Sequence, residues 1–272
     1  MAEVAVQRRG LRAPGLASRR WRQAAAVVVG WAAFFGVWWF ASEVLFNPYR
    51  LPPPGDVLDA MWSIVKSGEV WTQFKASLGK IFMGFGLGVV LGVPIGFLMG
   101  TTRYWKSFFH DPVMVAGSVP GITYAVLALV IFGIGLEGPI LAVALISMPY
   151  IALNVAAGLE GIDANLITMG KAFGRPRRDI LRHILIPTIA PFVFAGVRLS
   201  FALAWKVEAL TEVFGSSDGI GFMIRRSYQL FSVVDVLAWT GLFVIFMLLL
   251  ERLVLVRLER YLFRWRPQEA AA

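Results

Sequence analysis

Long apolar segments alternate with short polar segments along most of this chain. Six of them carry few charges and have about the length that a helix needs to cross a bilayer. Each is a continuous apolar run rather than a strict alternation, which favours helices over strands. The pattern therefore predicts an all-α, polytopic membrane protein with six transmembrane helices, over residues 24–46, 77–100, 112–132, 140–158, 187–214 and 236–256.

The composition agrees with this prediction and excludes several classes of protein. Hydrophobic residues make up 58% of the 272 residues and charged residues 16%, whereas soluble domains are about a quarter charged. The net charge of +9 comes from basic residues at the ends of apolar segments, and no soluble domain remains that would bind nucleic acid. There is no cysteine and there are two histidines, which lie in separate predicted loops, so we expect no metal site.

Basic residues gather on one side of the predicted membrane topology. The tails 1–23 and 257–272 and the loops 101–110 and 159–187 are rich in arginine and lysine. Because such residues mark cytoplasmic segments, we expect both termini in the cytoplasm. The first apolar segment is too long for the hydrophobic part of a signal peptide, and we interpret it as a retained span.

The second predicted span carries a regular ladder of glycines at a spacing of four residues. This spacing places the glycines on one slowly drifting face of a helix, where small residues let a neighbouring backbone approach closely. The ladder has two interpretations: packing within the chain, which we favour, or a seam between two subunits. Its members are Gly84, Gly88, Gly92, Gly96 and Gly100.

The loop before the fifth span contains a basic, amphipathic stretch that is interrupted by Gly174 and Pro176. Glycine permits the positive φ of a sharp reversal, and proline suits the first turn of a helix. One interpretation is an interfacial loop that only fixes the topology. The other is a docking element, in which Met169 and Phe173 enter an apolar groove of a soluble partner and nearby arginines pair with acids or lipid phosphates.

This stretch resembles the cytoplasmic loop of binding-protein-dependent ABC importer permeases of the type I, MetI-like fold. Gly174 matches the glycine of that family, and Ile186-Pro187 matches the pair that follows about a dozen residues later. The Glu-Ala-Ala positions of the family fall on Thr168, Met169 and Gly170, which removes the expected acid. The Met-Gly pair looks like the branch that imports sulfonates, taurine, nitrate and bicarbonate, as do Glu212 and the segment 216–221.

The resemblance implies a non-catalytic permease subunit in the bacterial inner membrane, which forms a translocation pathway and binds no cofactor itself. It implies four kinds of partner: membrane lipid, a second permease subunit that is usually an identical copy, two copies of a cytoplasmic ATPase that uses ATP and Mg, and a periplasmic or lipid-anchored binding protein. The ATPase is a separate chain, because neither Gly170-Lys171-Ala172 nor Gly79-Lys80-Ile81 carries the hydroxyl residue of a phosphate-binding loop. The ATPase-coupling residues that it implies are Thr168, Met169, Gly170, Lys171, Phe173, Gly174, Arg175, Arg177, Arg178, Asp179, Arg182 and Pro187.

Six polar residues within predicted spans are candidates for the substrate pathway, because charges in a membrane usually face a cavity or a partner. Lys206 favours an anion such as a sulfonate, nitrate or an aromatic carboxylate, while a vitamin or pyrimidine precursor stays open. A membrane-embedded transferase would need clusters of histidine or acids, which are absent, and a mere anchor would not need charges in mid-span. The candidates are Lys206, Glu208 and Glu212, and, more weakly, Asn154, Tyr124 and Ser118.

Overall fold

The computed structural model describes residues 16–263 and divides the chain into two compact units, 1–58 and 59–272. The first unit contains α1 (Leu16–Phe40), which a π-helical turn, η1 (Ala41–Leu45), extends. Residues 24–45 are apolar enough to cross a membrane, and the Trp38 indole nitrogen donates to the Pro52 carbonyl at 3.0 Å. Basic tails are predicted at 1–23 and 257–272. Their parts at 1–15 and 264–272 lie outside the described residues.

The described part of the chain is helical and contains no strand, so the prediction of an all-α protein is confirmed. Five of its helices are long and apolar enough to span a membrane, or six if one bent pair counts as a span. After α1, the elements are α2 (Pro54–Ser67), α3 (Glu69–Thr101), α4 (Arg103–Ser118), α5 (Gly121–Phe132), α6 (Glu137–Glu160), α7 (Ala164–Ala172), α8 (Arg177–Ile180), η2 (Leu181–Leu185), α9 (Ile186–Gly215), α10 (Ile220–Gln229), α11 (Val233–Leu250), η3 (Glu251–Leu255) and α12 (Val256–Leu262).

The segment expected as a single span over 112–132 is broken, and its first half begins earlier. The loop expected at 101–110 forms the first turns of α4, and α4 and α5 meet at an angle of 92°. The cause lies at Val119 and Pro120: proline has no N–H for the helix ladder and disfavours a helical conformation in the residue before it. The polar stretch 215–234, expected as a loop, likewise contains the short helix α10.

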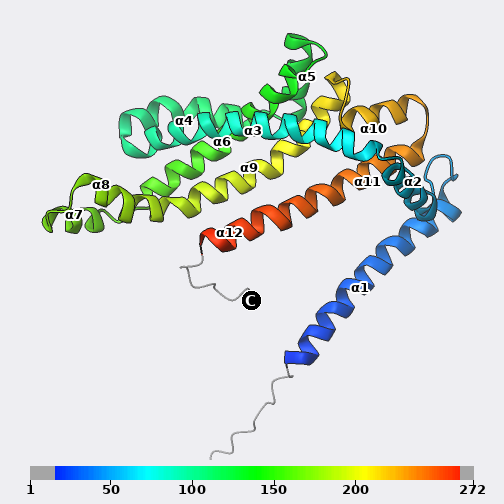
Figure 1. Ribbon diagram of the computed structural model, residues 1–272, viewed down its shortest axis with the longest axis horizontal. Coiled ribbons are helices and arrows are strands. Elements are labelled where there is room, and N and C mark those ends of the chain that lie inside the picture. The colour runs from blue at the N-terminus through cyan, green and yellow to red at the C-terminus, as the bar shows by residue number, and fades with distance from the viewer. Residues whose placement is uncertain (1–15, 264–272) are drawn as a thin grey trace, which may run out of the picture. The chain divides into compact units, whose positions relative to one another are not determined.

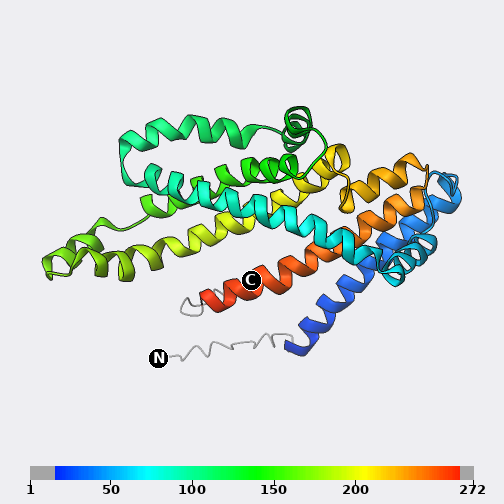
Figure 2. The ribbon, with the colours of Figure 1, turned by 45° about the horizontal axis from the view of Figure 1, so that its top comes forward.

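The glycine ladder of α3 lies along α6, which confirms packing within the chain. A Cβ atom added at Gly88 would lie 2.8 Å from the Ser147 Cβ, and one added at Gly92 would lie 2.8 Å from the Met148 carbonyl oxygen. The helices therefore touch backbone to backbone, an approach that any larger residue would prevent. Seen in Figures 1 and 2, α3, α6 and α9 run side by side through the second unit.

The two ends of this unit differ in what they carry. The short helices α7 and α8 form one end, and α10 lies at the other, as Figures 1 and 2 show. Residues Arg177–Gly215 form one helical path through α8, η2 and α9. This path therefore connects the two ends directly. Beside it, an apolar core at the α10 end joins α3, α9 and α11 through contacts such as Phe74 with Phe246, whose ring centroids are 4.1 Å apart.

Candidate coupling insert and pathway residues

The predicted docking element, here called the insert (residues 159–187), has a defined reversal at its centre. Asp163 accepts a hydrogen bond from the Asn165 N–H at 2.8 Å and thereby caps α7. Gly174 ends this helix with φ +70°. Its N–H donates to the Lys171 carbonyl at 2.9 Å, and the Arg175 N–H donates to the Gly170 carbonyl at 3.1 Å. These two bonds form the Schellman motif, which satisfies the last carbonyls of a helix.

The two arms of the insert pack against each other on either side of this reversal. Gly170 is buried, and a Cβ atom added there would lie 3.3 Å from Ile180 and 3.5 Å from Ile184. Phe173 is 77% exposed and Met169 is 51% exposed. A shallow groove lies between the arms, lined in part by these two side chains and by Arg175, Pro176, Asp179 and His183.

The basic residues predicted for coupling are exposed. Arg175 lies 3.9 Å from Asp179, while Lys171, Arg177, Arg178 and Arg182 face solvent. Thr168, which stands where the family has an acid, is also exposed, but its hydroxyl donates to the Ala164 carbonyl of its own helix at 3.0 Å. Between Thr168 and Pro187, the insert therefore presents apolar and cationic groups with one acid, Asp179, among them.

The second arm differs from the sequence expectation, in which a loop extends to 187 and a new span begins there. Pro187 lies in the first turn of α9 and is partly buried, yet the chain does not break there. The π-helical turn η2 lies directly before this proline, and the Ile186 N–H donates to the Leu181 carbonyl there. A proline is tolerated in the first turn of a helix, because an amide at that position needs no partner within the helix. The second arm and the fifth span are consequently one continuous helix.

The charged pathway candidates occupy two different environments. Lys206 is exposed on α9, and its ammonium group lies 5.6 Å from the centre of the Trp205 ring. Glu208 and Glu212 are instead buried inside the subunit, with 0% and 1% of their surfaces exposed. In this conformation, Lys206 alone of these three residues is available to a solute.

Glu212 belongs to a buried ion pair that the sequence analysis missed. Lys80 of α3 is 2% exposed, and its Nζ lies 2.9 Å from a Glu212 carboxylate oxygen and 2.6 Å from an Asp218 oxygen. Ser77 also donates to Glu212, at 2.8 Å. Lys80 could have been found from the sequence, because it is a charge within a predicted span and such a charge needs a partner.

Glu208 lies one helical turn from Glu212 on α9, and neither of its carboxylate oxygens has a hydrogen-bond partner in the described structure. Buried polar groups are nearly always hydrogen-bonded, so this carboxyl is exceptional.

The three weaker candidates direct their polar groups to backbone carbonyls. Asn154 donates to the Tyr150 carbonyl at 2.8 Å, and Ser118 to the Met114 carbonyl at 2.7 Å. The Tyr124 hydroxyl donates to the Ala116 carbonyl at 2.7 Å, and the Tyr150 hydroxyl to the Gly117 carbonyl at 3.2 Å. The two tyrosines thus donate to carbonyls in the last turn of α4, directly before the break between α4 and α5.

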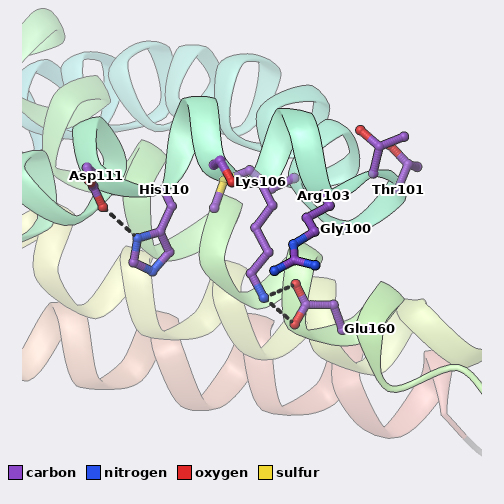
Figure 3. Close-up of a pocket in the computed structure, with 10 residues that line it drawn as sticks. Gly100, Thr101, Arg103, Lys106, His110, Asp111 and Glu160 are labelled. Atoms are coloured by element: carbon purple, nitrogen blue, oxygen red, sulfur yellow. Dashed lines mark hydrogen bonds and ion pairs between the residues drawn. The ribbon is translucent and has the colours of Figure 1, made fainter.

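A hollow lies where α3 ends, α4 begins and α6 ends, and Figure 3 shows its lining. Lys106 spans it and pairs with Glu160 at 2.8 Å, while His110 contacts Asp111 at 2.9 Å. The first pair joins α4 to α6 and is exposed, so it adds at most about 1 kcal/mol. Among residues 16–263, no three side chains of the metal-binding types gather closely enough to hold a metal ion.

These features define a class of protein: a polytopic helical membrane protein with an exposed helix–glycine–helix insert that continues into a span. A family model described as "Binding-protein-dependent transport system inner membrane component" matches residues 88–266. The chain belongs to this family and is the permease subunit of an ABC importer.

Comparison with characterised proteins gives several relatives. The chain is 27% identical to the taurine transport system permease protein TauC of Escherichia coli, over 92% of this chain and 94% of the relative. It is 26% identical to the nitrate import permease protein NrtB of Synechococcus elongatus, over 72% and 74%. Among solved structures, the MetNI methionine ABC transporter in an inward-facing conformation matches with a TM-score of 0.60 and 24% identity, over 75% of this chain and 97% of that chain. The structural match establishes the fold alone.

Proposed function

We propose that this permease imports a small solute with an anionic sulfonate or oxoanion group, of the taurine, sulfonate or nitrate type. Two observations support this proposal. Two relatives that match nearly the whole length of the chain carry taurine and aliphatic sulfonates in their names, and Lys206 is an exposed cation on α9. A cation within a span attracts an anion strongly, because the low dielectric of the membrane screens charge poorly.

The assembly around this chain is also part of the proposal. A soluble binding protein delivers the solute, two copies of a separate ATPase drive the cycle, and two copies of this chain enclose the pathway. The insert faces the cytoplasm together with both termini, in the bacterial inner membrane. This orientation follows from the basic residues of the insert and of the segments at both ends of the chain.

The single observation that carries the coupling role is the geometry of the insert. Phe173 projects from a rigid reversal, held by the Schellman bonds of Gly174 and by the packing of Gly170 on Ile180. An exposed aromatic residue on a rigid support is a suitable anchor for an apolar groove of a partner. The surrounding arginines supply cationic contacts, so we expect the docking surface of the ATPase to be apolar with an acidic rim.

The docking role is tested by replacing the anchor. In Phe173→Asp, a carboxylate would have to enter the apolar groove of the ATPase without a partner, which costs several kcal/mol. We therefore expect co-purification with the ATPase to fall at least tenfold and uptake to be lost, while the thermal stability of the isolated permease stays unchanged. Pull-down of the tagged permease together with its ATPase measures the first effect.

Phe231→Asp is the matched control, because Phe231 is also highly exposed, at 92%, and follows α10 at the opposite end of the unit. We expect this variant to keep the ATPase bound. Equal retention of the ATPase by both variants would contradict the docking role of Phe173.

The pathway role is tested at Lys206. We expect Lys206→Ala to lower uptake of the anionic solute at least tenfold, because α9 would lose the exposed cation that we propose attracts the solute, while ATPase binding stays unchanged. Lys206→Arg, which keeps the charge, should retain most of the uptake. Radiolabelled uptake into proteoliposomes distinguishes these outcomes, and wild-type uptake by Lys206→Ala would exclude a direct role of this lysine.

A further inference from the structure

We infer that Gln73, Ser77 and Lys80 of α3 clamp the 216–221 loop, which leads into α10 and includes its first two residues. The beginning of α3, the end of α9 and the beginning of α10 thereby form one rigid block. Lys80 is, in this inference, a positioning residue for transport. The three side chains follow at intervals of four and three residues, which places them on one face of α3. All three contact the 216–221 loop. The transport part of this inference rests on the proposed function, whereas the rigid block does not.

The clamp binds the backbone N–H groups at the beginning of α10. The Gly219 N–H donates to Gln73 at 2.8 Å, the Ile220 N–H to Ser77 at 2.9 Å and the Gly221 N–H to Glu212 at 2.9 Å. These are among the first amides of α10, which have no partner within their own helix. Their acceptors come from α3 and α9 instead, so α10 cannot shift at this end without losing hydrogen bonds.

Lys80 holds the loop that leads into α10. Its ammonium group donates to the Ser216 hydroxyl at 2.7 Å and to both the carbonyl and a carboxylate oxygen of Asp218, at 2.9 and 2.6 Å. With Glu212 at 2.9 Å, this one side chain connects three segments of the chain. An ammonium group has three protons, so these four acceptors use its full hydrogen-bonding capacity.

A second set of bonds closes the block from the side of α10. Arg225 donates to the Val213 and Phe214 carbonyls, each at 3.3 Å, and to the Ser216 carbonyl at 2.7 Å. These carbonyls stand in and just after the last turn of α9 and have no helical partner there. The end of α9 and the first turns of α10 therefore satisfy each other's backbone groups.

Two glycines allow this close approach. Gly219 has φ +99°, and a Cβ atom there would collide with the Glu212 carboxylate. A Cβ atom at Gly221 would lie 2.5 Å from the Glu212 Cβ. The loop therefore lies directly on α9, and even alanine at either position would separate them.

A buried ion pair is a poor means of gaining stability, because apolar residues of similar size often stabilise as well or better. Its advantage here is a fixed geometry, since the contacts of Lys80 fit one arrangement of the three segments. That geometry matters because Arg177–Gly215 is one helix that begins in the insert and ends in the block. A displacement of the insert is consequently transmitted along this helix to α10, because the block holds the two helices together.

The rigid block is tested by distance measurements on the purified full-length chain. The sequence has no cysteine, so spin labels attach only at Trp71→Cys on α3 and Tyr228→Cys on α10, two exposed positions. We expect a single narrow distance distribution in the chain alone. We expect the same distribution in the assembled transporter, with or without ATP, when only one of its two copies of this chain carries the labels. Adding Lys80→Met together with Glu212→Gln removes the buried ion pair of the clamp and leaves only the half-exposed Asp218 carboxylate without its cation. These two changes should broaden the distribution and lower uptake at least tenfold.

The control is the pair Lys106→Met and Glu160→Gln, which removes the exposed ion pair at the other end of α3. It should leave the Trp71–Tyr228 distribution narrow. If the double variant at Lys80 and Glu212 does not fold, Gln73→Ala with Ser77→Ala takes its place, since it removes two backbone contacts and no charge. An unchanged distribution in the clamp variant, or a broadened one with wild-type uptake, would each overturn the inference.

The test also separates this inference from the proposed function. Phe173→Asp should abolish uptake while keeping the α3–α10 distance narrow, because the anchor lies at the opposite end of the unit. If the wild-type distance is narrow and the clamp variant broadens it, but no anionic solute is transported, the block stands and the proposed substrate is wrong.

Discussion

Gly92→Val should prevent the second unit from folding. The α3–α6 seam leaves no room for a side chain there: a Cβ atom would lie 2.8 Å from the Met148 carbonyl oxygen and 2.9 Å from the Ile151 Cβ. Overpacking usually costs about 1–3 kcal/mol. We expect the upper end of this range or more, because the obstacle includes backbone of α6 that cannot rotate away. The measurements are the yield of monodisperse protein in detergent and its thermal unfolding.

Gly86→Val is the matched control for this substitution. Gly86 belongs to the same helix, two turns from Gly92, but no atom lies within 4 Å of a Cβ added there. We expect near wild-type yield and stability for this variant. Equal loss in both variants would mean that glycine serves the flexibility of α3 rather than its packing on α6.

Glu212→Gln should destabilise the protein by about 3 kcal/mol, whereas Glu208→Gln should change its stability by less than about 1 kcal/mol. The substitution at 212 removes the buried one of the two carboxylates that pair with Lys80, which is 2% exposed and cannot turn to water. It also places an amide where Ser77 and the Gly221 N–H donate. At 208, neither oxygen has a hydrogen bond to lose.

Thermal unfolding of the two variants in the same detergent compares these effects directly. The two positions make a close pair, since both are buried on α9 and one turn apart. A larger loss of stability for Glu208→Gln than for Glu212→Gln would contradict the assignment of Glu212 as the partner that Lys80 requires. Wild-type uptake by Glu208→Gln would in addition remove Glu208 from the pathway candidates.

Much of the fold follows from local features of the sequence. The long apolar runs predict helices because a backbone inside lipid must satisfy its polar groups within its own segment. The period-four glycines predicted a close helix contact, and Gly174 predicted the reversal in the insert, where φ is +70°. Both features depend on single residues that act on their immediate surroundings. The break at Pro120 was missed, although proline is itself a local signal, because the apolar run continues on both sides of it.

The assignment of polar residues within the spans depended on information that a single segment does not carry. Lys206, Glu208 and Glu212 lie within seven residues of one helix, and the sequence treats them alike as intramembrane charges. Whether each faces a pathway or another helix depends on which face of α9 meets α3. That contact joins residues more than 130 positions apart, such as Lys80 and Glu212.

The sequence by itself determined that this chain is a helical membrane protein, that α3 makes a close contact along its glycines, and that the insert reverses at Gly174. Hydrophobic length, residue size and backbone freedom are properties of each segment and need no partner. Only the tertiary structure decided that α6 is the neighbour of the glycine ladder, that α8 continues into α9, and that Lys80 joins Glu212 and the 216–221 loop. The physical reason is that a buried charge must find its counter-charge in space, and the order of residues along the chain does not say which helix supplies it.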